Sequence, residues 1–232
     1  RFVNERGTLT YKGDSSEVKV AQYSEVRIPR GGEYKVVLPD GTIVWLNAES
    51  SLRFPTLFTG KERKVYAKGE LYFDVKHDDT KPFIVEVEKD YSVRVLGTEF
   101  NLRAYSGFPV VTTLVEGRVQ VRGVGNTVSL APGQQALEVS GTRDIKVLDV
   151  DVAPYVAWHE GKFYFVHAPL NSIMEELARW YDVEVVFENP AVREECFTIE
   201  MQRFDDFNKV LRLIERTGMV TISVDGHIVT VK

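Results

Sequence analysis

The sequence is poor in cysteine, in long apolar runs and in positive charge. Cys196 is the only cysteine among 232 residues, so no internal disulfide can form. No run of about 18 apolar residues occurs, which excludes a membrane-spanning helix here, and no signal peptide is recognisable. The formal charge of −5, from 29 Lys and Arg against 34 Asp and Glu, leaves no basic excess. We therefore expect neither nucleic acid nor an anionic membrane surface as a partner.

The motifs of enzymes and metal sites are missing as well. The four histidines, His77, His159, His167 and His227, lack metal-ligand spacing, and Cys-x-x-Cys does not occur. Segment 123–128 has two glycines of a dinucleotide fingerprint but lacks the third. Neither Gly-x-Ser-x-Gly nor a phosphate-binding loop is present. We predict that the protein is not an enzyme and has no catalytic, cofactor-binding or metal-ligating residue.

What the sequence does have is a series of glycine turns between short runs of Val, Ile, Thr, Tyr and Phe. Glycine accepts the positive φ that many tight turns need, and β-branched and aromatic residues favour strands. Many short strands at this spacing predict a sandwich, a barrel or a β-solenoid. The turns are Asp40-Gly41, Lys68-Gly69, Leu96-Gly97, Glu116-Gly117 and Pro132-Gly133.

Four hairpins are predicted around turns of this kind. A further turn, Pro132-Gly133, fits the centre of a type II turn, because proline fixes the first central φ and glycine takes the positive second one. The hairpins join 36–38 to 42–46, 63–67 to 70–75, 83–87 to 91–96, and 111–115 to 118–121.

After about residue 160 the apolar period changes from two to about 3.6. Apolar residues of 170–181 recur at helical spacing, and Asp205 or Asp206 can cap a second helix that ends at Gly218. With the strands between them, the order is βαβ followed by βαββ. We therefore predict an all-β domain, a multi-hairpin sandwich or β-solenoid, followed by a small α/β domain. The expected divisions are 1–17 as a lead-in or stalk, 18–157 as the all-β domain and 158–232 as the α/β module.

Several ordered motifs resemble a known family. The resemblance covers roughly residues 20–232 and points to the FecR-like transmembrane anti-sigma regulators of the form typical of Bacteroidetes. The segment Trp158–Tyr181 looks like that family's C-terminal module, which is similar to the secretin and TonB N-terminal signalling fold, and 158–232 is assigned to this module. The motifs are Arg30-Gly31-Gly32-Glu33-Tyr34, Leu38-Pro39-Asp40-Gly41-Thr42, Val44–Ser50, Gly69–Val75, Lys81–Val85, Val95–Asn101, Thr113–Gly117 and Leu130–Gln135.

The resemblance implies a role and a location. Such proteins are single-pass inner-membrane proteins whose periplasmic region senses the signalling domain of a TonB-dependent outer-membrane transporter. A cytoplasmic segment controls an extracytoplasmic-function sigma factor, often in glycan uptake. This chain, which begins at Arg1 without Met, lacks that segment and the membrane helix. We therefore expect it to be the periplasmic sensor region, in contact with the membrane only through the missing helix.

The partner is expected to bind a strand edge or the junction between the two parts. The candidate edges are 163–166 and 227–231, because small βαβ sheets leave edges open. Neighbouring aromatic side chains in a strand or helix also point to different faces, so some of them lie outside the core. The candidate partner-binding residues are Trp158, Phe163, Tyr164, Phe165, Trp180, His227 and Val229.

Three other functions stay open. The first is a carbohydrate-binding module, in which Tyr66, Tyr72, Phe73 or Phe83 stacks on sugars, although strand alternation places about half of them in a core. The second is a glycan-active enzyme, which requires converging carboxylates in a groove. The third is a structural, secretin-like scaffold, suggested only by the C-terminal module.

Overall fold

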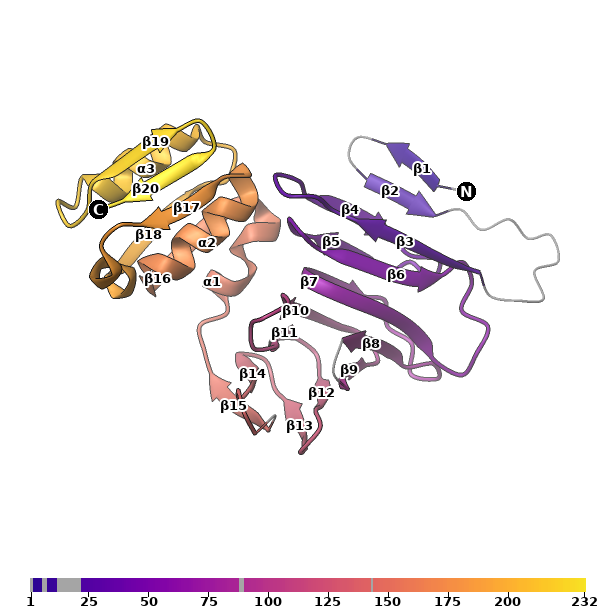
Figure 1. Ribbon diagram of the computed structural model, residues 1–232. Coiled ribbons are helices and arrows are strands. Elements are labelled where there is room, and N and C mark those ends of the chain that lie inside the picture. Colours follow the sequence, from indigo (N-terminus) through magenta and orange to yellow (C-terminus); the bar gives the residue numbers. More distant parts are fainter. Residues whose placement is uncertain (1, 6–7, 12–21, 88–89, 143) are drawn as a thin grey trace. The chain divides into compact units, whose positions relative to one another are not determined.

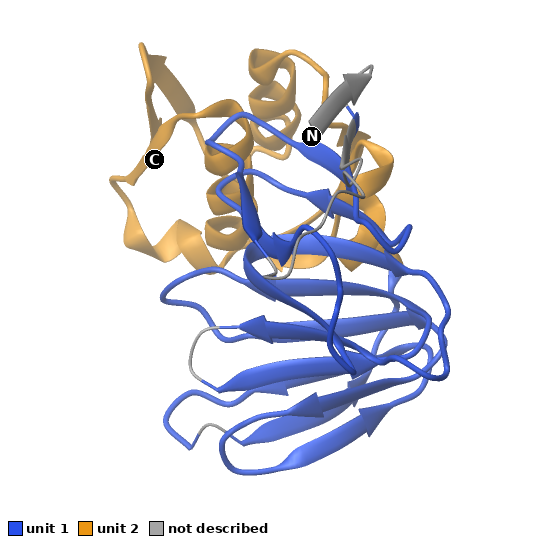
Figure 2. Cartoon of the chain, turned by 90° about the vertical axis from the view of Figure 1, so that its right-hand side faces the viewer, with its two compact units in different colours: residues 1–152 blue, residues 153–232 orange. Residues whose placement is uncertain are grey.

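The computed structural model describes residues 2–5, 8–11, 22–87, 90–142 and 144–232 (Figure 1). It divides into two compact units, residues 1–152 and residues 153–232 (Figure 2). Helix α1 (Ala153–Val156) and the 3-10 turn η1 (Ala157–Glu160) therefore belong to the second unit. The first unit is built of strands and the second is a small α/β unit, which confirms the predicted fold class.

The first unit consists of two ladders of strands that share one long strand, β7 (Arg63–Val75). Residues 63–68 of β7 pair with β6 and β8, whereas residues 69–75 pair with β5 and β10. The first ladder has the order β1-β2-β4-β5-β7-β10-β11-β14-β15 and the second has β3-β6-β7-β8-β9-β12-β13. The remaining strands are β1 (Phe2–Glu5), β2 (Thr8–Tyr11), β3 (Tyr23–Arg27), β4 (Tyr34–Val37), β5 (Ile43–Leu46), β6 (Ser51–Pro55), β8 (Phe83–Val87), β9 (Tyr91–Val95), β10 (Thr98–Ala104), β11 (Val111–Glu116), β12 (Val119–Arg122), β13 (Thr127–Leu130), β14 (Gln134–Glu138) and β15 (Ile145–Asp149).

Apolar faces of the two ladders form one core. Phe73, in the first ladder, stacks on Phe100 with ring centres 4.9 Å apart and meets Phe83 of the second ladder at 6.2 Å. All three rings are fully buried. Burying a side chain of this size stabilises the fold by about 1.5–3 kcal/mol. Buried apolar residues of both ladders thus form a sandwich core, which is one of the architectures that the sequence left open.

Two of the four predicted hairpins are confirmed, and at a third the chain passes from one ladder to the other. β4 pairs with β5, and β8 with β9, in antiparallel register. The hairpin predicted over 111–121 is wrong, because β11 pairs with β10 and β14 while β12 pairs with β9 and β13. Gly117 lies where the chain passes from one ladder to the other. The Pro132-Gly133 turn is confirmed, with Gln134 N–H donating to the Ala131 carbonyl at 3.0 Å and a φ of 83° at Gly133.

The hairpin predicted over 63–75 is wrong for a different reason. The segment is one continuous strand, and Gly69 bends it instead of reversing it. Gly69 has a φ of 87°, and a Cβ there would lie 2.4 Å from Ser50 Oγ and 2.7 Å from Ser50 Cα. The Ser50 hydroxyl accepts from Glu70 N–H at 2.8 Å and donates to the Glu70 carbonyl at 3.1 Å. Two chain segments thus touch at the bend, with no room for a side chain.

Arg63 ties several loops together at the start of β7. It is 2% exposed, and its guanidinium donates to the Lys76, Lys81 and Leu96 carbonyls at 2.7, 2.8 and 3.0 Å. It also forms a 2.9 Å ion pair with Asp40 in the turn before β5. Five fixed donors let one arginine satisfy loop carbonyls that would otherwise be buried without partners.

Part of the expected lead-in is structured. β1 and β2 form an antiparallel pair, and β2 lies parallel to β4. Residues 1, 6–7 and 12–17 of the lead-in lie outside the described residues.

The second unit follows the predicted element order. The helices over 170–181 and after Asp206 are confirmed, and the Asp206 carboxylate caps α3 by accepting from Lys209 N–H at 3.2 Å. β16 pairs with β18, and a separate sheet has the order β17-β20-β19. The elements are β16 (Lys162–Pro169), α2 (Leu170–Tyr181), β17 (Glu184–Phe187), η2 (Pro190–Glu194), β18 (Cys196–Gln202), α3 (Phe207–Glu215), β19 (Ile222–Asp225) and β20 (Ile228–Val231).

Gly69→Ala is expected to destabilise the first unit by about 2–4 kcal/mol, because it adds a Cβ clash to the strain of a positive φ. Gly107→Ala is the matched control, since Gly107 has a φ of 88° but no atom within 4 Å of the place that a Cβ would occupy. It is expected to cost only about 1 kcal/mol. Urea unfolding of both variants measures the difference; equal losses would show that close contact with Ser50 is not what selects glycine.

Candidate functional site

Aromatic side chains of the second unit gather around Arg203, directly after β18. The Arg203 guanidinium carbon lies 3.9 Å from the ring centre of Trp180, 5.1 Å from Phe163 and 5.7 Å from Trp158. Arg203 is 1% exposed. The negative face of an aromatic ring attracts a cation, most strongly where water is excluded. The rings therefore replace part of the hydration that the guanidinium loses on burial.

Hydrogen bonds fix Arg203 in this position. Its backbone N–H donates to the Gly161 carbonyl at 2.9 Å. Its backbone carbonyl accepts from Trp180 Nε1 at 2.7 Å and from the Tyr181 hydroxyl at 3.2 Å. The Nη1 group donates to the Trp158 carbonyl at 3.3 Å. The residue thus joins η1, the end of α2 and the end of β18 within one unit.

Three predicted partner-binding residues therefore come together, but around an internal cation. Trp158 and Phe163 are 4% and 1% exposed, and Trp180 is half-buried. The aromatic ring that extends from this cluster into solvent is Phe204, which is 72% exposed and lies 5.6 Å from Trp180. Sequence reasoning missed Arg203 and Phe204, since neither belongs to a run of aromatic residues.

β16 carries two further predicted residues on opposite faces. Phe165 is buried and stacks on Phe163 at 6.0 Å, whereas Tyr164 is half-buried and Val166 is 48% exposed. Within the described part of the chain, β16 pairs with β18 alone. Its other edge has no neighbouring strand, in agreement with the expectation for 163–166.

The prediction that 227–231 forms an open strand edge is wrong. β20 lies between β17 and β19, so both of its edges are already paired. His227 is exposed, and its backbone carbonyl accepts from Glu184 N–H at 2.7 Å. Val229 is fully buried in the core. An alternating apolar pattern indicates which side chains face a core, but it does not distinguish a central strand from an edge strand.

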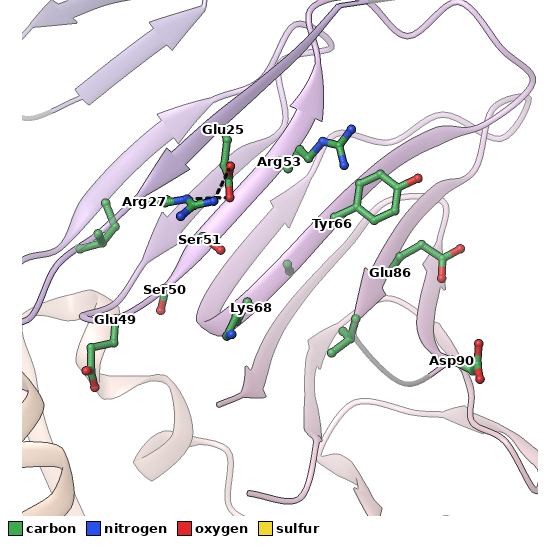
Figure 3. Close-up of a pocket in the computed structure, with 13 residues that line it drawn as sticks. Glu25, Arg27, Glu49, Ser50, Ser51, Arg53, Tyr66, Lys68, Glu86 and Asp90 are labelled. Carbon is green, nitrogen blue, oxygen red and sulfur yellow. Dashed lines mark hydrogen bonds and ion pairs between the residues drawn. The ribbon is translucent and has the colours of Figure 1, made fainter. Parts of the chain in front are cut away.

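The first unit has a groove of about 680 Å³ on the outer face of its second ladder (Figure 3). Tyr66 lines this groove and is 39% exposed. The other aromatic residues considered for sugar stacking, Tyr72, Phe73 and Phe83, are at most 3% exposed. Only Tyr66 of these four presents its ring to a ligand.

Asp74, in β7, is an ionisable group with a perturbed pKa. Burial, and then the nearby Glu99 carboxylate, raise the pKa of Asp74, but no histidine or cysteine is paired with it in the interactions described. Among the residues that the structure describes, no group of three His, Cys, Asp or Glu side chains is placed to hold a metal ion. Cys196 is half-buried, and its thiol contacts the Glu194 carbonyl at 3.5 Å.

The chain as a whole is similar to two crystal structures of a candidate anti-sigma factor from Parabacteroides distasonis ATCC 8503. Identities are 30% and 29%, and each match has a TM-score of 0.82 and covers 90% of this chain and 98% of the solved chain. Models of the FecR protein and of the FecR C-terminal region match residues 24–120 and 162–231. The chain belongs to the FecR family of anti-sigma regulators. No curated protein shows significant similarity to it.

The two FecR models fall on separate structural units. The FecR match lies within residues 1–152, and the FecR C-terminal match lies within residues 153–232. The second match includes Arg203, Phe163 and Trp180 of the cluster and the unpaired edge of β16. A FecR regulator acts through protein partners, so exposed edges and surfaces matter more here than enclosed cavities.

Arg203→Ala is expected to lower the stability of the second unit by about 3 kcal/mol or more, since it removes the cation at the centre of three rings and leaves a cavity. Arg212→Ala, at an exposed position of α3, is the control and is expected to change stability by less than about 0.5 kcal/mol. Thermal unfolding followed by tryptophan fluorescence reports on the Arg203 surroundings directly. A loss no larger than that of the control would contradict the proposed structural role.

Tyr181 makes the second unit sensitive to alkaline pH. Burial, and then the Asp205 carboxylate, raise the pKa of Tyr181 to about 12, compared with about 10 in an unfolded chain. Because the neutral phenol is favoured in the folded state, its stabilising effect is complete below about pH 10 and is lost towards pH 12. Tyr181→Phe is expected to flatten the decline in stability over this range, whereas Tyr155→Phe, at an exposed position, leaves it unchanged. Unfolding titrations between about pH 8 and 12 test this; identical slopes in both variants would refute it.

Proposed function

We propose that this chain is the periplasmic sensor region of a single-pass inner-membrane anti-sigma regulator. Its signal comes from the signalling domain of a TonB-dependent outer-membrane transporter, through protein–protein contact. It acts on an extracytoplasmic-function sigma factor through a cytoplasmic segment outside these 232 residues, and it catalyses no reaction. The support is membership of the FecR family over both units. Among the described residues no helix has the length and apolarity needed to cross a bilayer.

The unpaired edge of β16 is the proposed contact for the transporter domain. An extended strand of a partner can add to such an edge by main-chain hydrogen bonds, while neighbouring side chains supply specificity. Tyr164 and Val166 offer partly exposed side chains beside this edge. The Arg203 cluster holds the same strand from its buried face through Phe163. A rigid edge of this kind lowers the entropy that a partner loses on binding.

Control of transport genes, including those for glycan uptake, is the proposed consequence of this contact. A nearby gene for an extracytoplasmic sigma factor and another for a transporter with a signalling domain would identify the partners to purify. The assignment to 18–157 as sensor scaffold and 158–232 as signalling module is part of the same proposal.

Val166→Glu is expected to weaken binding of the cognate transporter's purified signalling domain by about tenfold or more, since it adds a charge that must be desolvated at the contact. Leu57→Glu, which places the same charge at another exposed apolar position of the first unit, is the control. Isothermal titration calorimetry with the full chain measures both. Binding that is unchanged in Val166→Glu and in Tyr164→Glu would place the contact elsewhere, and no binding to the unmodified chain would refute the proposed partner.

A further inference from the structure

The second unit has a groove of its own, between α3 and the end of β18. Its volume is about 300 Å³. Tyr164 and Val166, the side chains beside the proposed partner edge of β16, are not in its lining. The lining residues are Met201 near the end of β18, Asp205 in the loop that follows, and Lys209, Val210, Arg212, Leu213 and Arg216 in α3 and at its C-terminal end.

The exposed face of α3 supplies most of this lining. Lys209, Arg212, Leu213 and Arg216 follow one another at i, i+3, i+4 and i+7, which places them in one stripe about 10 Å long. All four residues are exposed. The rest of the helix packs into the core of the unit through Val210, Leu211 and Ile214. The stripe therefore presents one apolar side chain, Leu213, among three cations.

The apolar side chains of the groove can hold an apolar side chain of a partner. Met201 and Val210 are buried, whereas Leu213 is 41% exposed. A methionine side chain is unbranched and polarisable, so it adapts its shape to a group packed against it. An apolar residue inserted beside these three would leave water and would also cover Leu213. Anchoring by a large side chain in a pocket with a polar rim is a common form of protein recognition.

The rim of the groove carries positive charge that the lining does not balance. Asp205 is the one carboxylate among the lining residues, and Lys209 Nζ holds it at 3.0 Å. Within the described part of the chain, Arg212 and Arg216 form no ion pair. The neighbouring carboxylate of Glu215 is outside the lining and accepts from Ile222 N–H at 2.7 Å.

This positive rim contrasts with the charge of the unit that carries it. Residues 153–232 contain 8 Lys and Arg against 13 Asp and Glu, so the unit as a whole is negative. Three of its eight cations lie in this one groove. A local positive field attracts an acidic partner and disfavours a basic one, which gives the groove a preference that its apolar floor alone would not have.

We propose that this groove binds a short acidic segment of a partner protein. One leucine or phenylalanine side chain of the segment packs against Met201, Val210 and Leu213, and flanking carboxylates bind Arg212 and Arg216. The two arginines are four residues apart on α3, so their Cβ atoms are about 6 Å apart, and carboxylates one helical turn apart in the segment match them. Each guanidinium offers paired donors to a carboxylate. The contact is independent of the one proposed at β16.

The hollow shape favours a protein segment over an anionic lipid surface. Lipid phosphates could approach the exposed Arg212 and Arg216. A flat layer of headgroups would, however, leave the buried side chains of Met201 and Val210 uncovered. A single side chain that projects from a peptide reaches them. The apolar floor and the charged rim are therefore used together only by a segment that carries both an apolar anchor and carboxylates.

Methionine-methyl NMR with designed peptides tests the proposal on the full chain. The probe is a capped peptide of sequence EELLEELLEE, and its matched controls are QQLLQQLLQQ, which lacks the charge, and EESSEESSEE, which lacks the anchor. The acidic apolar peptide is expected to shift the Met201 methyl signal saturably, with a Kd of about 1 mM or tighter. Each control is expected to bind at least about tenfold more weakly. The signal of Met174, which is fully buried in the core, serves as an internal reference.

Variants locate the site. The double variant Arg212→Gln, Arg216→Gln and the single variant Leu213→Ser are each expected to weaken binding of EELLEELLEE by about tenfold or more. Arg193→Gln, at an exposed position of η2 outside the groove, is the control and leaves the affinity unchanged. All of these positions are exposed, so unaltered melting temperatures are expected and show that the variants remain folded.

Four results would overturn the proposal. The first is that EELLEELLEE leaves the Met201 signal unchanged up to about 10 mM. The second is that either control peptide, or the variant without the two arginines, binds as tightly. The third is that phosphatidylglycerol vesicles bind the chain through the same residues and displace the peptide, which would assign the surface to a membrane. The fourth is that the Met201 signal shifts with protein concentration alone, which would assign the groove to a second copy. None of these results bears on the transporter contact at β16, which is measured with the transporter domain.

Discussion

The architecture of the first unit depends on the close contact between Gly69 and Ser50. β7 belongs to both ladders only because it can bend there, and the bend brings two backbones within the space that a Cβ would occupy. The contact also places Glu70, whose carboxylate accepts from Asn47 at 2.9 Å and from Asn101 at 3.1 Å. A single missing side chain thus lets one strand align neighbours on both sides of the core.

Arg203 has the corresponding structural role in the second unit, although a buried charge and not a close backbone contact is responsible. Transfer of a cation from water to the interior costs several kcal/mol unless other groups compensate. Here three rings and a backbone carbonyl surround the guanidinium, so the favourable interaction exists only when η1, α2 and β18 are assembled. Charge burial therefore makes the unit cooperative, and it explains why aromatic residues far apart in the sequence converge.

The sequence predicts local structure well and long-range pairing less well. The Pro132-Gly133 turn and the helix over 170–181 were predictable because local dihedral preferences and apolar spacing determine them. The turns at Gly117 and at Pro132-Gly133 have similar signatures, yet each joins a strand of one ladder to a strand of the other instead of joining two paired strands. Turn chemistry decides where a chain reverses, whereas the burial of side chains such as Leu114 and Val119 in a common core decides which strands become neighbours.

In the candidate sites, too, local patterns were predictable and long-range contacts were not. Phe163 and Trp180 could be singled out because aromatic residues in series cannot all face one core, and Trp158 because it lies at the expected boundary between the two parts. An arginine such as Arg203 looks like a surface residue until its neighbours are known.

The register across β3, β6, β7 and β8 could not be predicted from the sequence either, because it brings together residues between 25 and 86. Any effect of binding at one unit on the affinity of the other unit for its own partner must be reciprocal. A reciprocal effect would make the chain an integrator of two inputs, whereas independent affinities would make the two units separate receptors on the same chain.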